Sequence, residues 1–193
     1  MVNVYFLPFV GSEYDSGGIF GKKILILGES HHCDPGEATR NFTKDVMEKH
    51  LYEESYSTFT KFERSLVGRE TNQDERIKIW NSLIFYNYLQ EPMSDVRLAG
   101  TREQYCAAES ALFAVLEKYA PEYMIVWGTS RLWCYIPKAR WTGLPAINVD
   151  GKDVFHGEYL LDNKHSVKTI GVYHPSSGYS WDYWYKVLTT WWR

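Results

Sequence analysis

Cysteines are few in this sequence, and long apolar runs are missing. The three cysteines, Cys33, Cys106 and Cys134, are widely spaced, which excludes a disulfide framework and a Cys-x-x-Cys metal pair. No apolar run approaches 18 residues, so a membrane-spanning helix is not expected. The first residues also lack the basic and apolar regions of a secretory signal. These absences predict a reduced, soluble, cytoplasmic protein without a membrane partner.

Excess positive charge is missing as well. The net charge of −3 provides no long-range attraction for nucleic acid, which favours single-stranded or small substrates over nonspecific duplex binding. Neither an internal repeat nor a Pro/Gly-rich linker divides the 193 residues, so we expect one domain covering residues 1–193. Aromatic residues, in contrast, make up 17% of the chain, and such side chains either fill a core or stack on nucleobases.

Short apolar runs alternate with amphipathic segments along the chain. The apolar runs predict buried strands at 24–27, 82–90, 123–128 and 167–175, with a further strand-like run at 157–162. Helices are predicted at 35–54, 72–82, 101–119, 129–137 and 180–192. This alternation indicates the α/β class, in a three-layer α/β/α arrangement with a central, mainly parallel, four-stranded sheet.

The starts of three predicted helices carry recognisable signals. Asn72 is followed three residues later by Glu75, and Thr101 by Gln104, so each pair forms a capping box for the free N–H groups of the first turn. Pro35 is expected near the start of the first helix, where a missing N–H is tolerated.

Unusual polar residues lie at the ends of the predicted strands, in the segments 28–34, Asn87, 127–129 and 174–177. Ligands of parallel α/β sheets bind beyond the carboxyl ends of the strands, so we expect these segments to line one pocket. Asn87 lies in an apolar strand, so its side-chain amide needs hydrogen-bond partners, which the edge of a flat heterocycle would supply. His174, held by the following proline, is placed to donate a hydrogen bond to a developing oxyanion. For both residues the alternative is a hydrogen bond to a neighbouring loop.

The run 31–34, His-His-Cys-Asp, also permits a metal site. Adjacent side chains diverge, so such a site would need His156, His165 or His174 as a further ligand. Ser30 is not followed two residues later by a glycine, which excludes the Gly-x-Ser-x-Gly elbow of the α/β-hydrolases.

Taken in order, the segments "LILGES", "LIFYNYL", "IVWGTS" and "VYHPSS" resemble the uracil-DNA glycosylase superfamily. They span residues 25–177, and their collinear order carries the resemblance. The resemblance implies a DNA-repair hydrolase that removes a deaminated base such as uracil. It further implies DNA or a free nucleobase or nucleotide as partner, and no metal or organic cofactor.

Residue roles follow from the same resemblance. His174 matches the histidine that stabilises the departing base, Asn87 the residue that reads the base edge, and Phe42 the aromatic that stacks on it. Glu29 stands at the position whose backbone binds a base carbonyl. Many members have a water-positioning Asp where this chain has Ser30, so Glu29 or Asp34 would hold the water instead.

The remaining matched positions concern phosphate and base selection. Ser176 and Thr129 correspond to phosphate contacts, and His32 to a tyrosine that excludes the methyl group of thymine. Some members carry an iron–sulfur cluster on four cysteines, which the three cysteines of this chain exclude.

Two other function classes stay open. The spacing Gly-Glu-x-x-His at 28–32 resembles erythromycin-esterase-like hydrolases, which would act through Glu29 and His32, with or without metal. A catalytically inactive nucleotide or nucleic-acid binding protein is the other class. Sensitivity to a change at His32 but not at Asn87 would favour the esterase-like class, whereas binding without cleavage would favour the inactive one.

Overall fold

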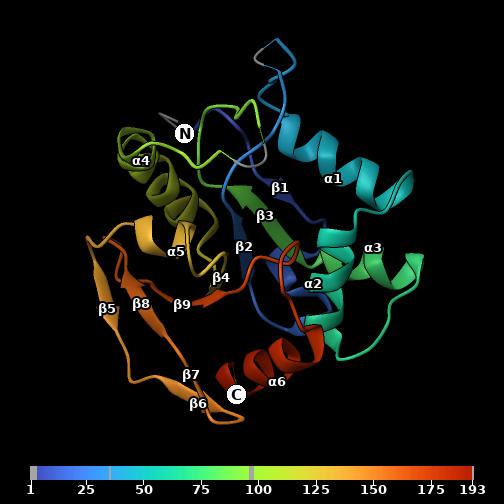
Figure 1. Ribbon diagram of the computed structural model, residues 1–193, viewed down its shortest axis with the longest axis vertical. Coiled ribbons are helices and arrows are strands. Elements are labelled where there is room, and N and C mark those ends of the chain that lie inside the picture. The colour runs from blue at the N-terminus through green and yellow to red at the C-terminus, as the bar shows by residue number, and fades with distance from the viewer. Residues whose placement is uncertain (1–3, 35, 96–97, 193) are drawn as a thin grey trace.

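The computed structural model describes residues 4–34, 36–95 and 98–192 (Figure 1). Within these ranges, seven strands form one sheet, in the order β1 (Phe9–Val10), β3 (Leu83–Asn87), β2 (Ile24–Gly28), β4 (Tyr123–Trp127), β9 (Ser166–Val172), β8 (His156–Leu160) and β5 (Trp141–Gly143). The pairs β3–β2, β2–β4 and β4–β9 are parallel, whereas β1, β8 and β5 join antiparallel. A separate hairpin pairs β6 (Ile147–Val149) with β7 (Lys152–Val154).

The prediction of a four-stranded sheet is therefore wrong for the sheet as a whole. Its four parallel strands are the ones expected, and they form the centre. The edge strands β1 and β5 contain only two and three residues, too few to show an alternating pattern in the sequence. The run at 157–162 does correspond to β8, which extends the sheet beyond β9.

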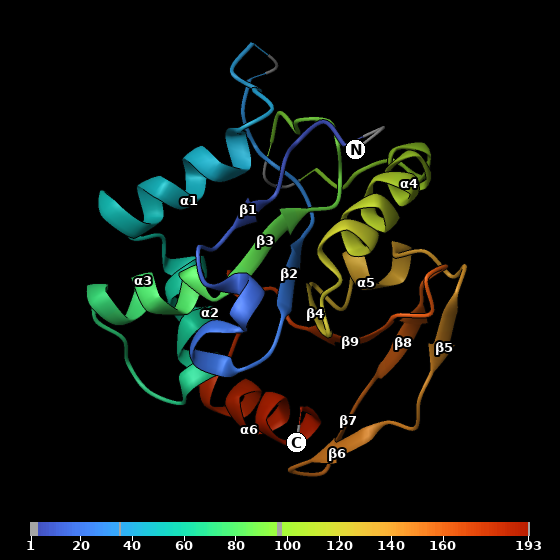
Figure 2. The same cartoon turned by 180° about the vertical axis from the view of Figure 1, so that it is seen from behind.

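Helices cover both faces of the central strands (Figures 1 and 2). Their bounds are α1 (Phe42–Tyr52), α2 (Ser57–Val67), α3 (Gln73–Asn81), α4 (Arg102–Tyr119), α5 (Leu132–Tyr135) and α6 (Trp181–Trp191). Successive strand residues point to opposite faces: Leu25 and Leu27 pack with α4 and α5, and Ile24 and Ile26 with α1, α2, α3 and α6. This two-sided burial explains the continuous apolar runs of the strands.

Both predicted capping boxes are confirmed. Asn72 Oδ1 accepts from Glu75 N at 3.0 Å, and Thr101 Oγ1 accepts from Gln104 N at 3.3 Å. The first predicted helix is shorter than expected, because α1 begins at Phe42 and the preceding residues form turns and loop. Pro35 lies outside the described residues. The sequence pattern also missed α2, whose buried side includes the charged residue Glu63.

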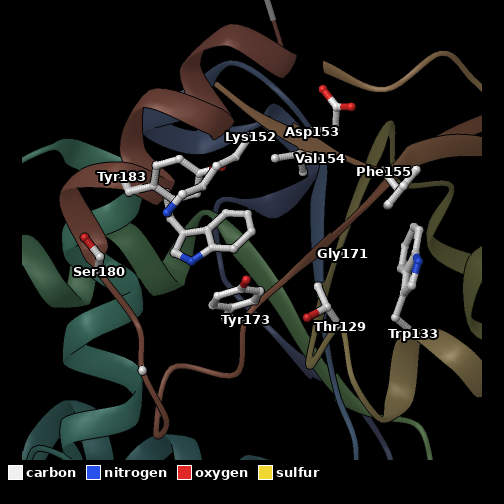
Figure 3. A pocket seen from close by; sticks show the side chains of 12 residues that line it. Thr129, Trp133, Lys152, Asp153, Val154, Phe155, Gly171, Tyr173, Ser180 and Tyr183 are labelled. Carbon is white, nitrogen blue, oxygen red and sulfur yellow. The ribbon is translucent and has the colours of Figure 1, made fainter. Parts of the chain in front are cut away.

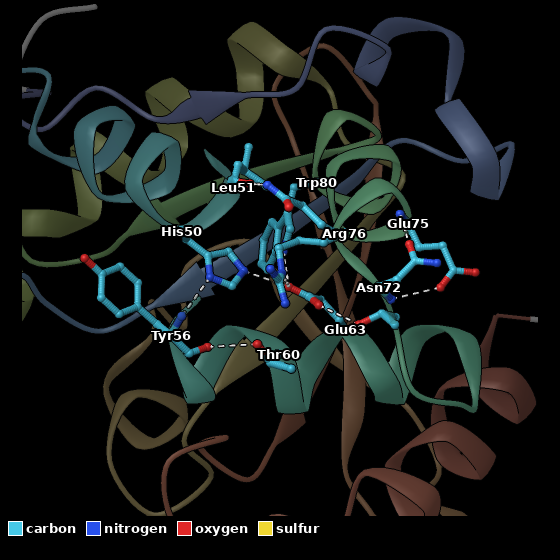
Figure 4. A network of polar contacts seen from close by, with 11 residues as sticks. His50, Leu51, Tyr56, Thr60, Glu63, Asn72, Glu75, Arg76 and Trp80 are labelled. Carbon is cyan, nitrogen blue, oxygen red and sulfur yellow. Dashed lines mark hydrogen bonds and ion pairs between the residues drawn. The ribbon is translucent and has the colours of Figure 1, made fainter. Parts of the chain in front are cut away.

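A buried polar network ties α1, α2 and α3 together (Figure 4). The Glu63 side chain is fully buried, and Glu63 Oε1 lies 2.7 Å from His50 Nε2 and 3.0 Å from Trp80 Nε1. Arg76 Nε donates to the same oxygen at 3.3 Å, and Thr71 Oγ1 donates to Oε2 at 2.9 Å. Burial alone would raise the pKa of Glu63, but the hydrogen bonds from His50, Trp80 and Thr71 outweigh it and hold this pKa below its usual range.

In the part of the chain that the structure describes, no helix has the length and apolar character needed to cross a lipid bilayer.

Candidate functional site

The carboxyl ends of the parallel strands bring the predicted segments to one edge of the sheet. Gly28, at the end of β2, stands opposite Asn87, at the end of β3. On the other side of β2, Trp127 of β4 stands opposite Val172 of β9. His174 follows β9 by two residues, and its ring lies edge-on to Trp127 at 5.9 Å between centroids.

The loop after β2 runs alongside the segment that follows β3. Tyr88 N donates to Gly28 O and Leu89 N to Glu29 O, both at 2.9 Å, and Met93 N donates to His31 O at 2.8 Å. Three backbone hydrogen bonds thus fix the loop in place. A functional group carried on it is therefore held on a firmly positioned backbone.

The Asn87 side chain braces this loop from inside. Its Nδ2 donates to Ser30 O at 3.2 Å and to the ring of His31, 3.0 Å from Nδ1. A Cβ at position 28 would lie 2.1 Å from Asn87 Oδ1, so only glycine fits there. Among the described residues nothing donates a hydrogen bond to that Oδ1. Asn87 therefore has its amino group engaged, whereas its carbonyl oxygen packs against Gly28 and accepts no hydrogen bond from the described residues.

His31 connects Asn87 to Phe42. Its Nε2 lies 2.8 Å from Thr43 Oγ1, and the Phe42 and Phe6 rings meet it at centroid distances of 5.1 and 4.8 Å. Burial, and secondarily the charge of His32, lower the pKa of His31 to about 3. His31 is therefore a neutral, structural member of the site.

Glu29 is the centre of a second cluster. Tyr105 Oη donates a short hydrogen bond to Glu29 Oε1, and Arg131 Nη2 lies 3.1 Å from the same atom. Burial and the bond to Glu29 raise the pKa of Tyr105, so its hydroxyl keeps the proton that it donates. Glu29 is 12% exposed, and its Oε2 accepts no hydrogen bond from the described residues. One oxygen of the carboxylate is thus available to a ligand or a water.

His174 is held in one tautomer by Ser176. The backbone N–H of Ser176 donates to His174 Nδ1 at 3.3 Å, and Ser176 Oγ lies 2.7 Å from the same nitrogen. Because a backbone N–H can only donate, Nδ1 is the acceptor and the neutral ring carries its proton on Nε2. His174 therefore presents a hydrogen-bond donor at Nε2.

Electrostatic interactions join His174 to the Glu29 cluster. Burial lowers the pKa of His174; Glu29 opposes this effect, and Arg131 and His32 add to it. The pKa of His32 is lowered by burial first, with Glu29 acting in the opposite direction. The structure thus brings Glu29, His32 and His174 into one another's electric field, at the edge of the sheet where Asn87 ends β3.

Other predicted residues stand apart from this cluster. The exposed Asp34 lies further along the loop, where its carbonyl accepts from Glu37 N at 2.9 Å. Thr129 instead lines a cavity of about 450 Å³ beside β9, and the other predicted site residues do not line it. No group of three or more His, Cys, Asp or Glu side chains suited to a metal ion occurs within residues 4–34, 36–95 and 98–192.

Two residues of the site were missed by the sequence analysis. Tyr105 lies in the helix predicted at 101–119 and is buried, but its hydroxyl reaches Glu29. Arg131 precedes α5 and directly follows the motif at 125–130, which gives no role to the residue after it. Neither had a local signal, because their partner lies 76 and 102 residues away in the chain.

Comparison with known proteins finds no family model that matches the chain and no curated protein that matches it.

Proposed function

We propose that this protein recognises an extruded or free nucleobase and hydrolyses the N-glycosidic bond of a deaminated base, such as uracil, in single-stranded DNA. The observation that carries the proposal is the position of His174, a neutral imidazole donor, and Glu29, a carboxylate with one oxygen unbonded among the described residues, after the carboxyl ends of β9 and β2, the two strands that flank β4 in the sheet. The collinear motifs of the sequence add to it. In this proposal the fold is a three-layer α/β/α domain, and the protein is cytoplasmic.

The reaction needs both groups at the same time. When the bond between C1′ and the base breaks, its electron pair moves onto the base, and negative charge develops on a base oxygen. His174 Nε2–H donates to that oxygen. A water molecule forms the new bond to C1′ and gives its proton to Glu29 Oε2, which then passes it to the departed base.

Recognition of the base uses the side-chain carbonyl of Asn87. Its Oδ1 accepts from the N3–H of uracil, since its amino group is engaged by Ser30 and His31. Phe42 supplies the stacking face in this proposal, and Ser30 and His32 border the base. Net charge disfavours a duplex, so the substrate is a single strand.

The other residues have supporting roles in this proposal. Ser176 and Thr129 contact phosphate, and Asp34 is the second candidate for holding water. Ser176 has an additional part, because it fixes the tautomer of His174.

The test is a single-turnover glycosylase assay on single-stranded and duplex oligonucleotides that contain uracil, hypoxanthine or xanthine. His174→Ala is expected to lower the rate of uracil release by about 100- to 1000-fold, the usual cost of one oxyanion donor. Asn87→Ala should weaken base binding. The matched control is His156→Ala, since His156 Nε2 bonds only to a loop carbonyl, Pro145 O, at 2.9 Å. Absence of an abasic product with the wild-type protein would contradict the enzymatic part of the proposal.

A second candidate is an esterase-like hydrolase that uses Glu29 and His32. The electrostatic interaction between these two side chains supports it. Ester hydrolysis that is abolished by His32→Ala and indifferent to Asn87→Ala would identify this activity. Saturable binding of uracil-containing strands without cleavage would instead identify a catalytically inactive binding protein.

A further inference from the structure

A cavity of about 450 Å³ lies between the end of β9, the start of α6, the strand β7 and the short helix α5 (Figure 3). Its volume falls in the range of small-molecule sites. The lining residues that matter here are Thr129, Trp133, Lys152, Phe155, Tyr173 and Tyr183. Figure 3 shows Thr129 and Tyr173 between two walls, with Trp133 and Phe155 on one side and Lys152 and Tyr183 on the other.

Aromatic rings dominate the walls of the cavity. Phe155 is 68% exposed and Tyr173 is 52% exposed, although both are large apolar side chains. The indole of Trp133 packs directly on the backbone of β9, because a Cβ at Gly171 would lie 2.8 Å from that ring. Flat, solvent-accessible rings of this kind are suited to stacking on a planar ligand.

One cation of the cavity is free to meet an anion. Lys152 Nζ lies 5.2 Å from the centroid of the Tyr183 ring and forms no ion pair with a described residue. The neighbouring Asp153 accepts from Asn148 Nδ2 at 2.7 Å, and Lys186 is paired with Asp150 at 2.7 Å. Lys152 thus supplies positive charge to a cavity that Asp153 also lines with negative charge.

The cavity and the proposed base site share one backbone segment. Tyr173 lines the cavity, and the next residue, His174, belongs to the Glu29 cluster. Thr129 likewise lines the cavity two residues after Trp127, whose ring contacts His174. A ligand that fills both places has at least two linked parts, and adjacent nucleotides of a single strand are such a ligand.

We propose that this cavity binds a nucleotide that flanks the target base in single-stranded DNA. Phe155 and Tyr173 stack on its base, and Lys152 contacts its phosphate. The inference rests on the proposed function, because it assigns the neighbouring nucleotide of the same substrate.

The first test compares the affinities of two ligands by fluorescence: deoxyuridine alone, and a labelled pentanucleotide with one deoxyuridine between thymidines. Phe155→Ala is expected to weaken binding of the pentanucleotide about tenfold, the usual effect of losing one stacking ring, and to leave deoxyuridine binding unchanged. The matched control is Tyr52→Ala, an aromatic residue that is 58% exposed at the end of α1.

The second test uses the salt dependence of pentanucleotide binding. Lys152→Gln is expected to weaken binding severalfold and to reduce the slope of log K against log salt by about 0.7, as for one lost phosphate contact on a single strand. Lys118→Gln is the control, since Lys118 Nζ also lies over a tyrosine ring, 4.8 Å from the centroid of Tyr119.

The outcomes separate this inference from the proposed function. If the pentanucleotide binds no more tightly than deoxyuridine, or if both cavity variants behave like their controls, the cavity is not a nucleotide site and the base site is unaffected. If the wild-type protein binds the pentanucleotide through the cavity but does not bind deoxyuridine, the cavity is supported and the proposed base site is wrong.

Discussion

Glu63 and Glu29 are both hydrogen-bonded acidic side chains, but they differ in what surrounds them. Four side chains donate to the two oxygens of Glu63 or form an ion pair with them, and its exposed fraction is 0%. Glu29 has two partners on one oxygen, is 12% exposed, and keeps its other oxygen free of the described residues. A fully satisfied, sealed carboxylate stabilises packing between helices, whereas a partly satisfied one at the end of a strand can act on a ligand.

The largest effect is expected for Glu63→Ala. Its loss leaves the Arg76 guanidinium and the Trp80 N–H without an acceptor in the interior, so the free energy of unfolding should fall by about 3–5 kcal/mol. Urea denaturation followed by circular dichroism measures it. Glu29→Ala is the counterpart and should cost less, about 1–2 kcal/mol: Arg131 is 36% exposed and can bind water, so most of the loss comes from the buried Tyr105 hydroxyl, which is left without its acceptor. Equal losses for the two variants would contradict the distinction between a sealed and an open carboxylate.

Catalytic activity should depend more on Glu29 than on Glu63, the reverse of their effects on stability. Glu29→Gln removes the proposed proton acceptor and is expected to lower the single-turnover rate of uracil release about 100-fold or more. Glu63→Gln keeps the shape of its side chain away from the site, and the fraction that remains folded should cleave at the wild-type rate. A rate loss for Glu63→Gln in protein shown to be folded would mean that the two networks are coupled.

Acid should lower the stability of the protein through His31 and through Glu63 in different pH ranges. Folded His31, with its pKa near 3, binds fewer protons than the unfolded chain between pH 6.5 and 3, so stability falls as the pH falls through this range. Between pH 6.5 and 4.5 the loss is about 2 kcal/mol. Glu63, whose pKa is depressed, loses its contribution only at lower pH, as the unfolded carboxyl becomes protonated below about 4.3.

Denaturation midpoints at several pH values measure these slopes. His31→Gln should flatten the slope above pH 4.5, and Glu63→Gln should flatten it below. His32 and His174 contribute in the same direction as His31, so part of the upper slope will remain in the first variant. An unchanged upper slope in His31→Gln would show that His31 is not the buried neutral group described above.

The smallest effect is expected for Tyr105→Phe. It removes the hydroxyl that holds Glu29 and keeps the ring stacked on Tyr135, whose centroid is 4.2 Å away. We expect about 1 kcal/mol less stability and about a tenfold slower release of uracil, with unchanged base binding. Tyr88→Phe is the control, since its hydroxyl donates to Tyr105 O at 2.9 Å and does not touch Glu29. A rate loss of the same size in both variants would assign the effect to packing of the tyrosines.

The central strands and most helices could be predicted because their signals are local. The runs at 24–27 and 123–128 are apolar on both faces, and the capping boxes at Asn72 and Thr101 mark helix starts within four residues. The edge strands β1 and β5 and the helix α2 escaped prediction. Two or three residues carry no periodicity, whereas α2 did have a local signal that was overlooked, because Phe59, Phe62 and Leu66 recur at helical spacing.

The candidate site was predictable only as a set of strand ends. Sequence order placed Glu29, Asn87 and His174 after parallel strands, and such ends meet at one edge of a sheet. Which partners they would have was not predictable. Asn87 turns its amino group toward His31, and Glu29 bonds Tyr105 and Arg131 from distant helices.

Patterns within a few neighbouring residues were enough to predict the α/β class, the four parallel strands and the polar residues at their ends. The folded arrangement was needed to show that Glu63 is sealed among three helices and that Glu29 is partly open at the sheet edge that also holds the neutral His174. The folded arrangement also forms an aromatic cavity between β9, α5, β7 and the start of α6. Burial and hydrogen-bond partners arise from residues that are far apart in the chain, and no local pattern encodes them.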